Sequence, residues 1–303
     1  MATRSAKPNL SNPARKAYDD YKRHLTNELD LRPATIRNYL SDVQQFMAWF
    51  EKQHTQHFTL DAIATPTLTS YRDYLQHDLH RKPRTINRYL VSLKRYFSWA
   101  TQTEQIQRNP SQPVKLVNET TTSPEQMTDT QEAQLMASIQ RENNQRDVTI
   151  ITLMLHSGLR VSEVCNLTWA QVVLQPRSGY LKIWGKRQKY REVPLNSTAR
   201  QTLYDLRQEI GTVPDGAVFA SVRTKGKLTP RAIGFIVKKY ANRANLDIHP
   251  HDLRHRFGYR MAKTTPLHRL AQIMGHDSLD TTMIYVQATK NDLQLEVENI
   301  AWE

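Results

Sequence analysis

The chain has 303 residues, 39% of them hydrophobic, which is enough for two domains with proper cores. Its single cysteine, Cys165, excludes an intramolecular disulfide and a zinc site built from cysteines. No apolar run approaches membrane-spanning length and no export segment follows the start, so we expect a cytoplasmic protein. The formal net charge of +13 favours a polyanionic partner, and nucleic acid is the natural one.

The first 108 residues are expected to form a helical domain. Aromatic and aliphatic residues recur at helical spacing over 13–28, 33–52, 66–79 and 83–103. The second and fourth of these helices begin with similar sequences, so we expect them to cross in one bundle. Basic residues on the polar faces of such helices can hold backbone phosphates and place a helix in the major groove of DNA. The DNA-binding candidates are Arg37, Arg84, Arg88, Lys94 and Arg95.

Residues 109–125 lose this periodicity and are predicted to be a linker, followed by a second domain over 126–303. The second domain contains a helix over 148–155 that is apolar nearly all round and therefore central. Two segments, 180–184 and 190–195, alternate apolar and polar residues and predict a β-hairpin. The fold class is thus mainly α, with a small antiparallel β-sheet in the second domain.

Two features of the second domain place positively charged side chains where they could bind an anionic ligand. Arg160 follows the helix end at Ser157-Gly158 and starts a new helix, where the helix dipole disfavours a positive charge. Glu163, one turn later, either orients Arg160 for a ligand or forms a purely structural pair with it. The hairpin tip at 185–189 is rich in lysine, and it either reaches into a cleft or remains a solvated turn.

The last quarter of the chain gathers further reactive side chains. A helix that begins at His249-Pro250 carries His251 and Arg254 on one face. The next helix ends at a glycine, so His276 lies just past a helix end. Tyr285 follows nine residues later, about two turns into a short helix. Two imidazoles, a guanidinium and a phenol with few carboxylates nearby suit an anionic substrate, which favours phosphate chemistry.

Simpler explanations exist for the same residues. His251 and His255 lie four residues apart, as ordinary neighbours on a helix do, and Tyr285 is one of thirteen tyrosines, most of them expected in the core. A zinc site at the two histidines is disfavoured, because the glutamate of a His-Glu-x-x-His helix is missing.

Taken in order, the motifs resemble those of the tyrosine recombinases, the integrase family that includes the Xer proteins. The matching stretches are Ser157-Gly158-Leu159-Arg160-x-Ser162-Glu163, Gly185-Lys186, His251-x-x-Arg254, Gly275-His276 and Tyr285. The resemblance implies a helical core-binding domain followed by an α+β catalytic domain. It also implies DNA cleavage and rejoining through a 3′-phosphotyrosyl intermediate and a Holliday junction, with no metal or other cofactor.

The resemblance also implies a role for each residue. Tyr285 is the nucleophile, Lys186 protonates the leaving 5′ oxygen, and His251 assists proton transfer around the nucleophile. Lys186 is preferred to Lys189 because it directly follows the hairpin glycine. The groups that hold the nonbridging phosphate oxygens are Arg160, Arg254 and His276, with Glu163 in support.

The partners implied are double-stranded DNA with short inverted-repeat core sites and other copies of the chain, as a tetramer on two sites. A terminal helix over 291–303 has an apolar stripe that is buried either on its own domain or, as the family suggests, in a neighbouring protomer. We expect a nucleoid-associated prokaryotic protein that acts in integration, excision or resolution of DNA. The alternatives are a type IB topoisomerase-like strand transferase and a DNA-binding protein of the same fold without cleavage.

Overall fold

The computed structural model describes residues 8–27, 31, 33–119, 125–185, 190–211, 216–221, 224 and 226–287. The chain forms two compact units, Met1–Thr121 (unit 1) and Thr122–Glu303 (unit 2). Along the part of the chain that the structure describes, no helix combines the length and apolar character needed to cross a membrane.

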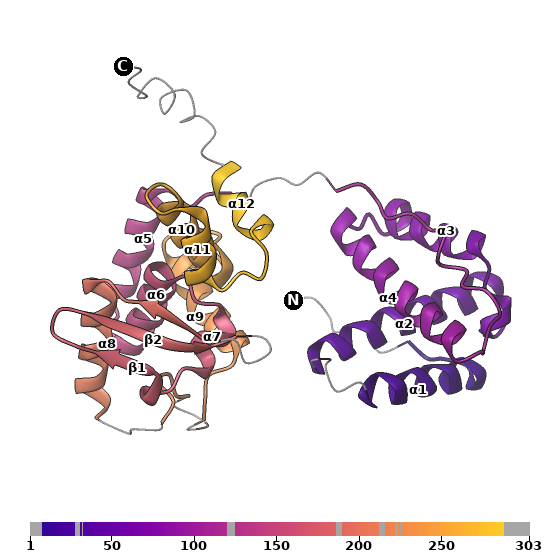
Figure 1. Ribbon diagram of the computed structural model, residues 1–303, viewed down its shortest axis with the longest axis horizontal. Helices are drawn as coiled ribbons and strands as arrows, with labels where there is room; N and C mark the ends of the chain where they lie inside the picture. The colour runs from indigo at the N-terminus through magenta and orange to yellow at the C-terminus, as the bar shows by residue number, and fades with distance from the viewer. Residues whose placement is uncertain are drawn as a thin grey trace, which may run out of the picture. The chain divides into compact units, whose positions relative to one another are not determined.

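Unit 1 is helical, as the sequence predicted. Its helices are α1 (Asn12–Asn27), α2 (Pro33–His54), α3 (Thr65–Asp73) and α4 (Pro83–Gln102), with a 3-10 turn η1 (Leu60–Ala62) and a π turn η2 (Tyr74–Asp78). The two similar helices, α2 and α4, pack against each other (Figure 1). Proline suits the first turn of both, because that position needs no amide donor. The core between them is aromatic, with the Phe46 ring meeting Tyr71 and Phe97 edge-on.

The stretch predicted as a linker from residue 109 packs on unit 1 as far as Val117. Val114 is 5% exposed and belongs to the core of the unit. The side chain of Asn87 in α4 donates to the carbonyl of Val117 (2.9 Å) and accepts from its amide (2.8 Å). A non-periodic stretch can therefore be part of a domain when helix side chains satisfy its backbone.

Unit 2 contains eight described helices and one small sheet. The helices are α5 (Asp129–Gln140), α6 (Gln145–Ser157), α7 (Val161–Asn166), α8 (Ser197–Ile210), α9 (Pro230–Arg243), α10 (Pro250–Ala262), α11 (Leu267–Met274) and α12 (Asp280–Gln287). A 3-10 turn, η3 (Trp169–Gln171), precedes the sheet. The strands are β1 (Val172–Leu174), β2 (Gly179–Trp184) and β3 (Tyr190–Pro194), all antiparallel in the order β1-β2-β3. The predicted hairpin is present, and β1 extends it on one side.

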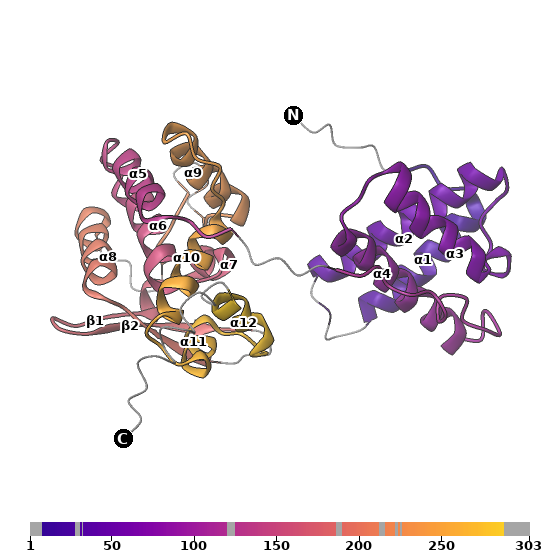
Figure 2. The same cartoon turned by 90° about the horizontal axis from the view of Figure 1, so that it is seen from above.

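Helix α6 is the centre of unit 2, as its apolar sequence indicated. It packs against both α8 and α10, and α6 and α10 lie side by side in both views (Figure 1 and Figure 2). Every α6 residue from Thr149 to Leu155 is buried. Helix α11 also contacts β3, so the end of α11 and the last strand of the sheet meet. The ends of α6, α10 and α11 are consequently brought close to one another.

Candidate active site

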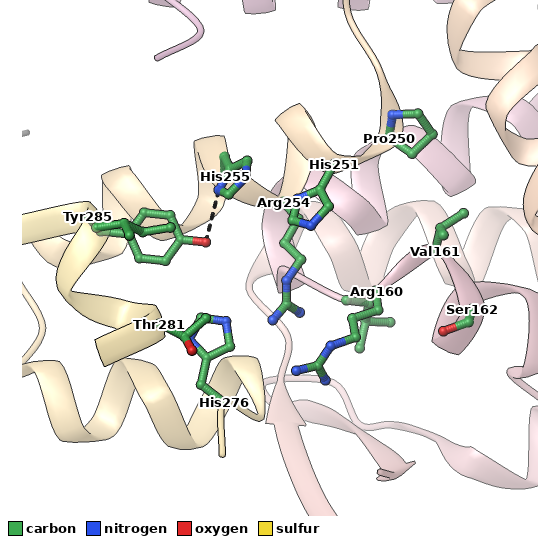
Figure 3. Close-up of a pocket in the computed structure, with 12 residues that line it drawn as sticks. Arg160, Val161, Ser162, Pro250, His251, Arg254, His255, His276, Thr281 and Tyr285 are labelled. Atoms are coloured by element: carbon green, nitrogen blue, oxygen red, sulfur yellow. Dashed lines mark hydrogen bonds between the residues drawn. The ribbon is translucent and has the colours of Figure 1, made fainter. Parts of the chain in front are cut away.

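A pocket of about 330 Å³ in unit 2 collects the side chains that the motifs singled out. Figure 3 shows two guanidinium groups, imidazole rings and a phenol directed at a common space. The start of α7, the first turns of α10, the turn after α11, and α12 supply them. The polar residues among those that line the pocket are Arg160, Ser162, His251, Arg254, His255, His276, Thr281 and Tyr285.

Arg160 is held by a carboxylate and a carbonyl. Helix α6 ends at Gly158, whose φ of 61° is left-handed, and the chain then starts α7 with Arg160 at the N-cap. The guanidinium donates from Nη1 to Oε1 of Glu163 (3.1 Å) and from Nη2 to the carbonyl of Gly275 (2.5 Å). Glu163 also accepts the amide of Arg160 at 2.8 Å. Glu163 therefore fixes Arg160 at both its backbone and its side chain.

Arg254 is 4% exposed, and its hydrogen bonds run to uncharged oxygens. Nη1 donates to the carbonyl of Gly158, and Nη2 donates to the carbonyl of Met274 at 2.9 Å. Burial, and next the nearby charge of Arg160, lower the pKa of Arg254 to about 10. The group is still protonated at neutral pH, and the carbonyls fix its direction without cancelling its charge. A buried cation of this kind suits an incoming anion.

Arg191 in β3 connects these parts from behind, and sequence reasoning gave it no role. It is 9% exposed and donates to both oxygens of Glu163, at 3.1 and 2.9 Å. Its Nε donates to the carbonyl of Ile273 at 2.9 Å. Burial raises the pKa of Glu163, but hydrogen bonds and charge from Arg191, and then from Arg160, leave that pKa below its ordinary value. Glu163 is thus a carboxylate shared by two arginines.

His276 is positioned by the end of α11. Gly275 has a φ of 67°, which favours glycine, and a Cβ there would lie 2.6 Å from Nη1 of Arg191, a side chain that Glu163 and Ile273 hold in place. Nδ1 of His276 lies 2.7 Å from Oγ1 of Thr282, which is fully buried. Burial, followed by the charges of Arg254 and Arg160, lowers the pKa of His276 to about 4. At neutral pH the ring is therefore uncharged.

Tyr285 lies with its ring against α10 and is 1% exposed. A Cβ on Gly258 would lie 2.5 Å from Cζ of Tyr285, so only a glycine on α10 leaves room for the ring. Tyr259 meets the ring edge-on at 5.1 Å. Burial raises the pKa of Tyr285 to about 12, although Arg254 and Arg160 act in the opposite direction. The hydroxyl is held protonated until a base removes its proton.

The hydroxyl of Tyr285 contacts His255 rather than the histidine that the motif selected. Nδ1 of His255 is 3.1 Å from the phenolic oxygen, as the dashed line in Figure 3 marks. The ring of His251 stacks on that of His255, with centroids 4.4 Å apart. His251 lines the pocket, but its role in proton transfer stays a prediction. No catalytic role was assigned to His255 from the sequence, although its place one turn from His251 was a usable signal.

The structure brings together five of the six predicted catalytic residues. The sixth, Lys186, and its competitor Lys189 lie outside the described residues, as does the tail over 291–303. Strands β2 and β3 flank residues 185–189 and form an antiparallel pair in which Ile183 lies opposite Arg191. Since Ile183 is buried, this register places the Arg191 side chain on the buried face. Arg191 and Val193 are two residues apart, so they lie on the same face of β3, and Val193 is buried. This spacing was the sequence signal for an inward arginine.

The basic candidates of unit 1 differ in their surroundings. Arg37 and Arg84 are exposed. Arg88 forms a salt bridge with Asp42, and Lys94 donates to the carbonyl of Gln112 at 3.3 Å. The guanidinium of Arg95 lies over the ring of Tyr39, 5.4 Å from its centroid. DNA binding by these residues stays a prediction.

Known proteins resemble the chain over both units. Residues 125–292 match the model of the phage integrase family, and residues 18–105 match the phage integrase N-terminal SAM-like domain. A tyrosine recombinase XerA of Pyrococcus horikoshii is 32% identical over 161 residues, 52% of this chain and 55% of that protein. A tyrosine recombinase XerC of Xanthomonas axonopodis pv. citri is 35% identical over 143 residues, 46% of each chain. The chain thus spans about half the length of the curated relatives it matches.

Solved structures share the fold. The Tn1549 transposon integrase in complex with a circular intermediate DNA has a TM-score of 0.76 at 20% identity, covering 96% of this chain and 100% of that one. The XerH recombinase bound to difH substrate has a TM-score of 0.72 at 22% identity, covering 94% and 84%. These matches confirm the predicted fold class. Because the integrase model alone matches more than half of the chain, the protein belongs to the phage integrase family, within which its named relatives are tyrosine recombinases.

Proposed function

We propose that the protein is a site-specific DNA recombinase that cleaves and rejoins duplex DNA through a bond between Tyr285 and a 3′ phosphate. One observation carries this proposal: a phenol, two guanidinium groups and an imidazole converge on one pocket. The described residues that line this pocket include no carboxylate. Such a site attracts a phosphodiester and offers it a nucleophile in the same space.

The chemistry follows from the side chains. The oxygen of Tyr285 attacks phosphorus, the bond to the 5′ oxygen breaks, and the phosphate becomes linked to the enzyme. Arg160 and Arg254 are fixed before the substrate arrives, so they stabilise the growing charge without reorganising. His276 adds a hydrogen bond, and Lys186 supplies the proton that the 5′ oxygen needs. The phosphotyrosyl bond keeps the energy of the broken bond, so rejoining requires no nucleotide hydrolysis.

The assembly belongs to the same proposal. Four protomers act on two short inverted-repeat DNA sites and exchange strands through a Holliday junction, in association with the nucleoid. Support comes from relatives: XerH was solved on a difH substrate before cleavage, and a lambda integrase dimer was solved on a core site. The apolar stripe of Leu293, Val297 and Ile300 supports docking of the tail into a neighbouring protomer.

Two other functions fit the same fold. A type IB topoisomerase-like enzyme would use the same pocket but rejoin the original strand, and a silent DNA-binding protein would not cleave. Tyr285 lies in the same pocket as the fixed arginines, and this favours cleavage, because a protein that only binds DNA does not need a nucleophile beside the phosphate-binding groups.

A covalent-adduct assay tests the proposal. The site is first selected from genomic DNA fragments that the purified chain binds, and a nicked suicide duplex is built on it so that the cleaved strand diffuses away. We expect wild type to form a protein–DNA adduct on a denaturing gel and to join the strand to a second labelled duplex. Tyr285→Phe should bind the duplex and form no adduct, since only the nucleophilic oxygen is lost. Adduct from that variant would contradict the assignment, and wild-type adduct that never joins the second duplex would favour the topoisomerase.

A further inference from the structure

The hydroxyl that the proposed reaction uses contacts a histidine to which no motif gave a role. Nδ1 of His255 lies 3.1 Å from Oη of Tyr285, which is a hydrogen-bond distance. The two rings are tilted by 59°, with centroids 5.7 Å apart. In Figure 3 the hydroxyl of Tyr285 faces the space that the guanidinium groups of Arg254 and Arg160 enter, and a dashed line joins it to His255 on one side of that space. When the neutral His255 ring carries its proton on Nε2, Nδ1 is an acceptor for the proton of Tyr285.

The neighbouring groups are less suited to accept that proton. Tyr285 is 1% exposed, so bulk water has little access to its ring and hydroxyl. Arg160 and Arg254 are donors and remain protonated. Nδ1 of His276 is already engaged by Thr282 at 2.7 Å. His251 stacks on the far face of His255 and has no contact with Oη among the hydrogen bonds of the described residues.

We propose that His255 is the general base that removes the phenolic proton of Tyr285 as its oxygen attacks the scissile phosphorus. The inference rests on the proposed recombinase function. As the Oη–P bond forms and the P–O5′ bond breaks, the phenolic proton passes to Nδ1 of His255. The leaving 5′ oxygen takes its proton from the general acid, proposed to be Lys186. When the strand is rejoined, His255 returns the proton to Tyr285, so the enzyme is restored.

The surroundings of His255 keep it in the form that a base needs. The titratable and charged groups that face it are His251, Asp252 and Arg254 on α10, Tyr285 on α12, and His276 after α11. Burial, followed by His251, lowers the pKa of His255 to about 4, so the ring is neutral at pH 7. A bound phosphodiester brings a negative charge into the pocket, which raises that pKa. DNA binding therefore strengthens the base when it is needed.

His251 provides a matched control for His255. Both lie on α10, both line the pocket, and their rings stack at 4.4 Å. Only His255 has a hydrogen bond to Tyr285 Oη among the described contacts. A loss of activity that is specific to His255 substitutions would therefore reflect transfer of the Tyr285 proton rather than the removal of one of two imidazoles from the pocket.

The test measures single-turnover adduct formation by the full chain on the nicked suicide duplex, as a function of pH. Asparagine places an amide near the position of Nδ1 but cannot accept a proton at neutral pH. We expect His255→Asn to slow adduct formation by about 10²- to 10⁴-fold, the usual contribution of general acid–base catalysis, and to leave DNA affinity unchanged. His251→Asn should lose less than His255→Asn. In the His255→Ala protein, imidazole added to the buffer should restore the rate, because it replaces the missing base. Substituting 3-fluorotyrosine at position 285 should also restore it, because a more acidic phenol needs the base less.

The outcomes separate the two proposals. A wild-type rate and an unchanged pH profile in His255→Asn overturn the role of His255 while wild-type adduct upholds the recombinase. If His255→Ala is slow and neither imidazole nor fluorotyrosine restores it, His255 only positions Tyr285, and its role as a base is overturned. If wild type itself forms no adduct, the recombinase function fails and the inference fails with it.

Discussion

Arg88 in α4 of unit 1 and Arg254 in α10 of unit 2 show how the partner of a cation decides what it can bind. Nη1 of Arg88 donates to both oxygens of Asp42, at 2.5 and 2.6 Å. Asp42 is 1% exposed and also accepts the hydroxyl of Ser92 at 2.7 Å. Arg254 is itself buried, yet its hydrogen bonds run to the carbonyls of Gly158 and Met274.

The two arrangements serve different purposes. A carboxylate cancels the charge of the arginine, so the Arg88–Asp42 pair mainly ties α2 to α4. Carbonyl oxygens fix a guanidinium by hydrogen bonds and leave its net charge available. The buried Arg254 can therefore face a phosphate, whereas the half-exposed Arg88 is already paired. Exposure alone is consequently a poor guide to which basic residues bind DNA.

Among the tests of this comparison, the largest effect is expected from removing Arg254, the cation that has no carboxylate partner. Arg254→Ala should slow adduct formation on the suicide duplex by about 10²- to 10³-fold, as the loss of one fixed transition-state donor does. DNA affinity should change far less, since the group acts mainly on charge that develops during cleavage. Arg88→Ala is the matched variant, and the rate at which bound DNA is cleaved should stay within a few-fold of wild type. Equal losses of cleavage and affinity in Arg254→Ala would mark that residue as a phosphate anchor instead.

The next effect is on stability and concerns the neutralised pair. Asp42→Asn removes the charge that meets Arg88 and weakens the acceptor of Ser92. We expect the free energy of unfolding of unit 1 to fall by about 1 to 3 kcal/mol, the usual result of disrupting a buried hydrogen-bonded group. Urea unfolding followed by tryptophan fluorescence measures it. Asp73→Asn is the control, because the Asp73–Arg72 pair is more exposed and should matter by less than about 1 kcal/mol.

Much of the site could be predicted because its signals are local. Gly275 ends α11 and Tyr285 follows His276 by a fixed spacing, so helix periodicity and a glycine stop sufficed. The contact of His255 with Tyr285 joins residues thirty apart and depends on how α10 and α12 pack. Arg191 reaches Ile273 across 82 residues, and no local pattern names that partner. The sequence therefore predicted which residues gather at the pocket better than which residues hold them in place.

Substitutions of Arg191 test whether its charged partner, Glu163, and its uncharged partner, the carbonyl of Ile273, act together on the site. Lysine at this position keeps the charge but cannot bind both oxygens of Glu163 and the carbonyl of Ile273 at once. We expect Arg191→Lys to slow cleavage of bound DNA by about tenfold, equivalent to about 1.4 kcal/mol, with little change in affinity. Combined with Glu163→Gln the loss should be less than additive, because both act through Arg160. Glu192→Gln, at the next position of β3, is the control, and additive losses would mean that Arg191 acts independently of Glu163.

The last expected effect is a dependence of stability on pH that comes from His255 and His276 on the uncharged side of the pocket. His255 and His276 have their pKa values lowered to about 4 from an ordinary 6.5. Between pH 4 and 6.5 these histidines are protonated in the unfolded chain but not in the folded chain, so the free energy of unfolding increases as the pH rises. The free energy of unfolding should therefore fall as the pH falls from 6.5 toward 4. The change is fully present only below about 4 and absent well above 6.5.

Urea unfolding at closely spaced pH values would reveal this slope. The interval from 6.5 to 5 is the informative one, because it lies above the ordinary pKa of 4.5 from which Glu163 is lowered. His255→Asn and His276→Asn should each flatten the slope, since asparagine does not titrate. Burial also lowers the pKa of His156, so part of the slope remains in every variant. A slope that neither pocket substitution reduces would mean that His255 and His276 are not held neutral by the arginines and the burial around them. The structure would then no longer explain why His255, the proposed base for Tyr285, is uncharged.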